Sequence, residues 1–325
     1  MEVQEDRFSY SIEILDGPLS GEVHRGVFYP EMGAAPGPGN EVIVNTVGLE
    51  MDLGTGGFAV ILPSAGGEAP RNEDHFVKMP YTPLQYPVSP ARQALTLEGV
   101  RVVVLPLHSH LAPACCAAAD LRPGVRTAFV WQEGGALPVE FSRTARVLRD
   151  KGLLDIVISC GNCFGGDLES PNVYSGLLAA AAVADVVIVG IGPGLIGTGA
   201  PYGHGGMSSA IALNAALALG AEPVLAPRVS AADPRERHRG LSHHTTTVLR
   251  ATLAPCRVAL PSGTGISVAG LTDQHDCVEV AYTAAGLEER FGLTFESMGR
   301  SYEDDAGFFD AAAAAVSLAL GKGVE

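Results

Sequence analysis

From about residue 99 onward, the sequence alternates short apolar runs with longer helix-like segments, and this pattern constrains the fold most. Residues 100–105 and 185–190 are two of the apolar runs, and each precedes a helix-like segment of ten or more residues. Apolar runs without strict alternation, joined by such helices, are typical of parallel strands covered on both faces. We therefore predict a doubly wound, mostly parallel, Rossmann-like three-layer α/β domain over residues 91–325.

The first ninety residues follow a different pattern. Short runs rich in valine, isoleucine and tyrosine are separated by glycine- and proline-rich turns. Several short strands at this spacing are typical of a small closed or half-closed barrel. We predict a small all-β, barrel-like domain over residues 1–90, ending in a proline-rich connector at residues 79–90.

The charge balance excludes several classes of partner. The chain has 21 Lys and Arg against 36 Asp and Glu, a formal net charge of −15. Such an excess of negative charge opposes binding to nucleic-acid phosphates or to anionic membranes.

No apolar run reaches the roughly 18 residues of a membrane span, and six cysteines in a large core-forming chain do not indicate a disulfide scaffold. We expect a cytoplasmic protein with no nucleic-acid or membrane partner, and a homodimer as its candidate assembly.

In parallel sheets, ligands bind beyond the carboxyl ends of the strands, so the loops after the strands are the candidate sites. The loop at residues 192–206 contains seven glycines, and their backbone N–H groups can approach an anion closely. The candidate ligand-binding glycines here are Gly192, Gly194, Gly197, Gly199 and Gly203. The alternative is a tightly packed turn.

The same loop contains the pattern G-x-G-x-x-G, which also occurs in nicotinamide-binding sites. That fingerprint requires a helix to begin at once and an acidic residue about 20 positions later. Further glycines and prolines delay the helix to about residue 207, and Arg228 stands at the end of the next strand. A nicotinamide site is therefore a weaker alternative.

Residues 228–245 form the densest polar segment of the chain. Its arginines suit carboxylate or phosphate, and its histidines can exchange protons near neutral pH. We predict that the first group binds the ligand and that the second supplies acid–base catalysis; the alternative is a solvated loop followed by a capped helix. The ligand-binding candidates are Arg228, Arg235 and Arg237, and the catalytic candidates are His238, His243 and His244.

Three other loops contribute further candidates. Asp167 and Glu169 follow a C-x-x-C pair, which we interpret as core cysteines. The two carboxylates could orient a histidine or hold a divalent ion, or simply cap a helix. His108 and His110 follow the first strand of the α/β domain, where an H-x-H pair can bind a metal ion, so His108 is also a catalytic candidate. Glu133 and Gly134 follow the next strand, where they form either another wall of the same cleft or a tight turn.

Several longer motifs identify a family resemblance. They are LGTGG (residues 53–57), KMPYTPLQ (78–85), GGALP (134–138), FGGD (164–167), GPG (192–194) and GLSHHT (240–245). Together they resemble an uncharacterised family of Firmicutes and Actinobacteria, a domain of unknown function. Before GGALP, where the family pattern has an acidic residue, the chain has Gln132-Glu133, and Glu133 supplies an acidic group there. The resemblance implies one family over nearly the whole chain and implies no reaction.

Our first hypothesis is an enzyme that acts on a small anionic ligand, phosphorylated or nucleotide-like. The glycine loop and the arginine segment would form a single anion site, and His108, Glu133 and Asp167 would converge with them at one edge of the sheet. The second hypothesis is a non-catalytic ligand sensor or assembly protein, and the third is a nicotinamide-dependent oxidoreductase. The cofactor and any metal ion stay open at this point.

Overall fold

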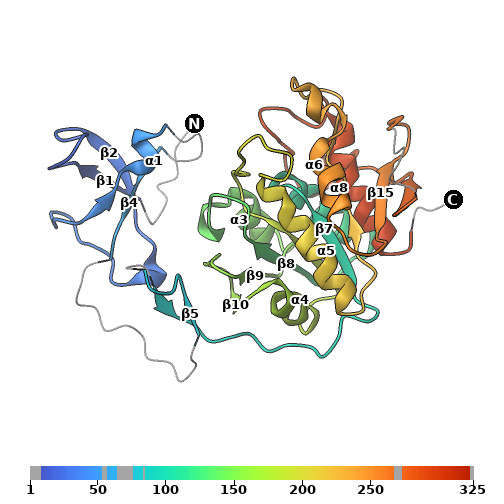
Figure 1. Cartoon of the computed structure of the whole chain (residues 1–325), viewed down its shortest axis with the longest axis horizontal. Coiled ribbons are helices and arrows are strands. Elements are labelled where there is room, and N and C mark those ends of the chain that lie inside the picture. Colours follow the sequence, from blue (N-terminus) through green and yellow to red (C-terminus); the bar gives the residue numbers. More distant parts are fainter. Residues whose placement is uncertain (1–8, 53–56, 64–75, 83–84, 267–272, 323–325) are drawn as a thin grey trace. The chain divides into compact units, whose positions relative to one another are not determined.

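The computed structural model describes residues 9–52, 57–63, 76–82, 85–266 and 273–322. The chain divides into two compact units, residues 1–89 and residues 90–325 (Figure 1). Residues 53–56 and 83–84, which belong to two of the sequence motifs, lie outside the described residues.

The first unit contains a small four-stranded sheet. Its strands lie in the order β1 (Ser9–Glu13), β2 (Val23–Val27), β4 (Ala59–Ile61) and β3 (Val44–Asn45). β1 is antiparallel to β2, β2 is parallel to β4, and β3 is antiparallel to β4. Two short helices, η1 (Pro30–Met32) and α1 (Val47–Glu50), and a two-stranded pair, β5 (Val77–Lys78) with β6 (Tyr86–Pro87), complete its described elements. The prediction of a small N-terminal β region is confirmed as a sheet, with β1 and β3 as its outer strands in the described residues.

The second unit is built on an eight-stranded sheet in which every neighbouring pair is parallel. The strands lie in the order β10 (Leu168–Ser170), β9 (Ile156–Cys160), β8 (Thr127–Gln132), β11 (Val186–Ile191), β7 (Arg101–Leu105), β12 (Val224–Leu225), β15 (Arg257–Pro261) and β16 (Asp276–Val280). The central strands are buried, and β8 and β11 are buried at every position. The predicted mixed α/β fold with a parallel sheet is confirmed.

Helices cover both faces of this sheet. Successive side chains of a strand point to opposite faces, so the apolar strands contribute to two hydrophobic cores. Val103 and Leu105 pack into one core and Val102 and Val104 into the other. The first core is covered by α2 (Leu111–Leu121), α3 (Arg143–Asp150), α7 (Leu287–Phe291) and α8 (Ala306–Ala319). The second is covered by α4 (Val173–Ala181), α5 (Ser208–Ala218) and α6 (His243–Arg250). No helix among the described residues is long and apolar enough to cross a lipid bilayer.

The strand order brings four post-strand loops together. The chain runs outward from β7 through β8 and β9 to the edge strand β10, and then returns to place β11 between β8 and β7. It continues on the other side of β7 with β12, β15 and β16. The loops after β8, β11, β7 and β12 therefore leave four adjacent strands at the same edge.

Glycines allow two of these loops to pack backbone against backbone. Ala136 N donates to the carbonyl oxygens of Pro193 (3.0 Å) and Gly194 (2.9 Å), joining the loop after β8 to the loop after β11. A Cβ atom on Gly135 would collide with the Gly192 backbone. A Cβ atom on Gly192 would lie 2.6 Å from the Leu137 carbonyl oxygen and against the Trp131 ring. The glycines at these positions are thus required by close approach of the chain.

The first prediction concerns Gly192→Ala. The added methyl group must displace backbone or the buried indole of Trp131, so we expect a loss of about 1–3 kcal/mol in the free energy of unfolding, measured by urea denaturation. Gly197→Ala is the matched control, because its Cβ would make only ordinary contacts at 3.5 Å or more. Equal stability of the two variants would contradict this account of the loop.

Candidate functional site

Four histidines gather where the loops after β11 and β12 meet. They are His204, from the return of the glycine loop, His238, from the short helix η5 (Glu236–His238), and His243 and His244, the first two residues of α6. The rings of His204 and His244 are stacked with centroids 3.7 Å apart. The other ring pairs are His243–His244 at 4.4 Å, His238–His244 at 4.7 Å, His238–His243 at 4.9 Å and His204–His243 at 5.9 Å. We call these four residues the histidine cluster.

Local hydrogen bonds place three of these rings. After β12 the chain forms a small hairpin of β13 (Val229–Ser230) and β14 (Gly240–Leu241). The hairpin brings Ser242, the residue after β14, back beside Arg228. Ser242 N donates to the Arg228 carbonyl oxygen (2.9 Å), and Arg228 N donates to Thr245 Oγ1 (2.8 Å). Ser242 Oγ accepts the His244 N–H at 3.2 Å and lies 2.7 Å from His238 Nδ1. Ser242 thus caps the N-terminus of α6 and holds the first helical turn, which carries His243 and His244.

A network of charges around one buried carboxylate lies beside the histidine cluster. Asp233 is completely buried and accepts hydrogen bonds from Arg235 Nε and Nη2, both at 2.9 Å, and from Arg228 Nη2 at 3.2 Å. Arg300 Nη2 lies 3.7 Å from the same carboxylate. Arg300 Nε also donates to Asp305 at 3.2 Å. We call Arg228, Asp233, Arg235, Arg300 and Asp305 the arginine network.

Burial and the neighbouring charges shift the pKa values of Asp233 and Arg228. Burial opposes ionisation of Asp233, but the hydrogen bonds and charge of Arg235, with the charge of Arg228, hold the pKa of Asp233 below its usual value. Burial, reinforced by the charge of Arg235, lowers the pKa of Arg228 to about 10. Both groups therefore remain ionised at neutral pH.

The histidines, in contrast, are held neutral. Burial lowers the pKa of His244 to about 2 and that of His238 to about 3; His204 and Arg228 add to the shift of His244, and Arg228 and Arg235 to that of His238. The pKa values of His204 and His243 are lowered as well, mainly by burial. Arg228 Nη1 lies 3.2 Å from His244 Nδ1. Because a guanidinium can only donate, His244 Nδ1 carries a lone pair.

Some polar atoms of the site are buried without a partner. Among the described residues, His204 Nδ1, His243 Nε2 and Arg228 Nε make no hydrogen bond. Most buried polar atoms are hydrogen-bonded, so such atoms point to a ligand, an ion or a water molecule. Arg237 is exposed, and its positive charge contributes to the lowered pKa of His243.

The glycine loop reaches this site through His204, but its glycines have local roles. Thr198 N donates to the Gly203 carbonyl oxygen and Gly205 N to that of Ile196, both at 2.7 Å, so the loop closes into a hairpin. Gly199 has a φ of 82° near the tip of this hairpin. Helix α5 begins only at Ser208, after the hairpin, so the G-x-G-x-x-G glycines do not open a helix as a dinucleotide site requires.

The predicted residues of the loops after β8 and β9 have local partners. Glu133 is exposed and accepts the Asn162 N–H at 3.0 Å, while Gly134 packs against Gly205. Asp167 pairs with Arg149 (2.5 Å) and accepts the Val157 N–H (2.8 Å), beside the start of β9. Glu169 lies on β10, and four strands separate β10 from β12. The structure therefore does not bring Asp167 and Glu169 to the histidine cluster.

His108 connects two elements of the fold through hydrogen bonds of its ring. Its Nδ1 lies 3.2 Å from the Ile191 carbonyl oxygen and its Nε2 lies 2.6 Å from Ser142 Oγ. The carbonyl can only accept, so Nδ1 donates and Nε2 accepts the Ser142 hydroxyl proton. Both ring nitrogens are used in joining β11 to the N-terminus of α3. His110 is fully buried against the Phe308 ring, at a centroid distance of 4.3 Å.

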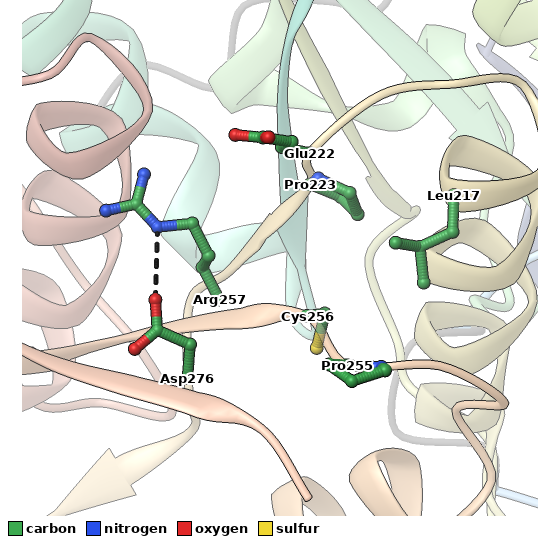
Figure 2. A pocket seen from close by; sticks show the side chains of 7 residues that line it. All are labelled: Leu217, Glu222, Pro223, Pro255, Cys256, Arg257 and Asp276. Atoms are coloured by element: carbon green, nitrogen blue, oxygen red, sulfur yellow. Dashed lines mark ion pairs between the residues drawn. The ribbon is translucent and has the colours of Figure 1, made fainter.

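Two cavities lie away from the histidine cluster. One of about 440 Å³ lies at the amino ends of β12, β15 and β16, the opposite edge of the sheet; Figure 2 shows the Arg257–Asp276 ion pair and Glu222 around it. Burial raises the pKa of Cys256 in its wall to about 12, so this thiol is not a nucleophile at neutral pH. The other, about 320 Å³, lies between α2, α3 and residues 292–296.

Comparison with known proteins identifies the family of this chain. A family described as a protein of unknown function (DUF3866) matches residues 25–316. The chain belongs to this family. The match spans parts of both units and confirms the resemblance to a domain of unknown function. No curated protein and no solved structure matches the chain. The family name carries no activity, so any function must be argued from the geometry.

Sequence reasoning missed part of the site. Arg300 and Asp305 come from the segment before α8 and follow no recognisable motif, so only the tertiary fold brings them to Asp233. His204 is a single histidine inside a glycine-rich loop. No pattern in the sequence indicates that its ring stacks on that of His244.

The second prediction concerns the pH dependence of stability. Burial lowers the pKa of His110 to about 3, with the charge of Arg228 adding to the shift. At pH values below 6.5, the ordinary pKa of histidine, His110 is protonated in the unfolded chain but stays neutral in the folded chain. The free energy of unfolding therefore falls as pH falls from 6.5 toward 3. Between pH 7 and pH 5 this residue accounts for a loss of about 2 kcal/mol.

His110→Leu should remove that part of the loss while keeping an apolar contact with Phe308. Urea denaturation of both proteins at pH 7 and pH 5 measures it. The variant should lose less stability on acidification than the wild type. An unchanged loss would show that His110 is protonated in the folded protein.

Proposed function

We propose that the protein is an enzyme acting on a small anionic ligand, phosphorylated or nucleotide-like, which binds at the histidine cluster beside Arg237. The observation that carries this proposal is the combination of an exposed guanidinium with neutral imidazoles, two of which, His204 and His243, each have one buried nitrogen without a hydrogen-bond partner among the described residues. The guanidinium supplies charge for the ligand, and the imidazoles supply lone pairs for chemistry.

The local charge supports an anion. Residues 228–244 contain four arginines and two carboxylates, in a chain whose net charge is −15. A positive region on an acidic protein attracts anions selectively. Arg228 and Arg235 are engaged by the Asp233 carboxylate and Arg239 by the Asp233 carbonyl oxygen, whereas Arg237 is exposed and its charge acts on His243. The planar fork of Arg237 suits a phosphate or carboxylate group.

The neutral histidines favour an enzyme over a non-catalytic sensor. A sensor binds its ligand through charge and shape and does not require unpaired lone pairs in the site. Buried lone pairs without a hydrogen bond destabilise the folded protein. An imidazole lone pair can accept a proton from a substrate or bind a metal ion. His243 Nε2 is such an atom, and His243 is the half-buried member of the cluster, whose pKa the charge of Arg237 helps to lower.

The third prediction tests the anion site. Inorganic phosphate should raise the melting temperature of the protein more than chloride does at matched ionic strength. Arg237→Gln removes one charge-assisted contact worth about 1.5–3 kcal/mol, so it should weaken phosphate binding by about 10- to 100-fold, measured by calorimetry.

Arg250→Gln is the matched control, since Arg250 is also exposed and ends the same helix that His243 begins. Both variants make the same change in net charge, so a general electrostatic effect would weaken both equally. That equal effect, or the absence of phosphate stabilisation in the wild type, would overturn the anion site.

A screen of phosphorylated and nucleotide substrates tests the enzyme assignment. Turnover by the wild type and its loss in His243→Gln, with phosphate binding retained, is the expected result. Phosphate binding without turnover of any substrate in the screen would favour the sensor.

A further inference from the structure

We propose that His238, His243 and His244 bind one divalent transition-metal ion of the zinc class. One ring nitrogen of each residue lies within 4.8 Å of the corresponding nitrogens of the other two. His238 and His244 are buried, and His243 is half-buried. The proposal goes beyond the anion site because it depends on imidazole nitrogens and needs no bound anion.

The donor set fits such an ion. Neutral imidazole is a preferred ligand of zinc, copper and nickel, with zinc–nitrogen distances of about 2.0–2.1 Å. Tetrahedral ligands at that distance are about 3.4 Å from one another. The three nitrogens therefore need to close by no more than about 1.4 Å, which small side-chain rotations supply. All three residues come from seven consecutive positions, 238–244, so no distant segment has to move.

A hydrogen bond orients one ligand of the cluster, and an unpartnered nitrogen marks another. If His238 Nδ1–H donates to Ser242 Oγ (2.7 Å), the lone pair lies on Nε2, which is how histidine ligands of metal ions are usually held. Ser242 is itself held as the cap of α6. His243 Nε2 is buried without a partner in the described part of the chain, and a metal ion would give it one.

Arg228 competes with the ion for His244. Its Nη1 donates to the lone pair on His244 Nδ1, at 3.2 Å. Ligation through Nδ1 would displace Arg228, and ligation through Nε2 would move the ring proton to Nδ1, facing Arg228. In either case Arg228 must release His244, so metal binding frees a guanidinium nitrogen. The carboxylates of Asp233 and Asp305 offset part of the positive charge beside the ion.

The coordination number connects this site to the proposed function. Three histidines leave one position of a tetrahedral ion for water or for a ligand oxygen, as in catalytic zinc sites. With the ion bound, the lone pairs of the three histidines serve as ligands, and the bound water provides the reactive group. Arg237 would keep its role in binding the anion.

The test uses the metal-stripped full chain titrated with Co²⁺, followed by competition with Zn²⁺. We expect one equivalent of Co²⁺, visible absorption typical of a tetrahedral nitrogen–oxygen site, and displacement by Zn²⁺. His238→Asn and His243→Asn should each weaken binding by at least about 100-fold, more than the 10- to 100-fold typical of lost second-sphere contacts. His24→Asn is the control, since His24 pairs with Glu22 outside the cluster.

Two further variants separate this proposal from the anion site. Arg237→Gln should keep metal binding while losing phosphate binding, and Arg228→Met should bind the metal at least as tightly as the wild type because the competitor is gone. If a histidine variant fails to fold, the cobalt spectrum and stoichiometry of the wild type decide. Less than one equivalent bound, a spectrum without nitrogen ligands, or equal affinity in folded histidine variants and His24→Asn would overturn the metal site.

Discussion

The buried carboxylate of Asp233 is the group on which the arrangement of the site depends. It accepts hydrogen bonds from Arg228 and Arg235, and a third guanidinium, that of Arg300, lies 3.7 Å away. Each arginine comes from a different place: the end of β12, the hairpin tip and the segment before α8. Removing one partner of such a buried group leaves uncompensated charge and costs about 3–5 kcal/mol. Asp233 therefore joins three segments that would otherwise repel one another.

Burial, reinforced by the same charges, determines the protonation of the neighbouring histidines. Burial and positive charge both oppose an imidazolium, so the rings of His238 and His244 remain neutral well below pH 7. An anion bound at Arg237 would relieve part of this repulsion, and a divalent cation at the imidazoles would increase the affinity for that anion. Each ligand would then strengthen the binding of the other by the same factor.

The sequence was sufficient for the fold of the second unit and for part of the site. Continuous apolar strands such as β11 and alternating helices predict a parallel sheet, and the rule that ligands lie after strand ends led to residues 228–244. It could not predict the roles of Gly192 and Gly134, because a glycine needed for close packing and one that contacts an anion look alike in sequence. Asp167 was misplaced because the chain folds back along β9 after residue 160. Arg300 and Asp305 join the site only through tertiary packing, which no local pattern records.

The most direct test of this account is the protonation state of the histidine rings. Long-range ¹H–¹⁵N spectra of the metal-stripped protein, with assignments from single His→Asn variants, report the charge and tautomer of each imidazole. At pH 6 we expect His238 and His244 to be neutral, with the proton of His244 on Nε2 because Arg228 occupies Nδ1. A protonated imidazolium at either residue at pH 6, or a proton on His244 Nδ1, would contradict the claim that burial, reinforced by the arginine network, holds these rings neutral.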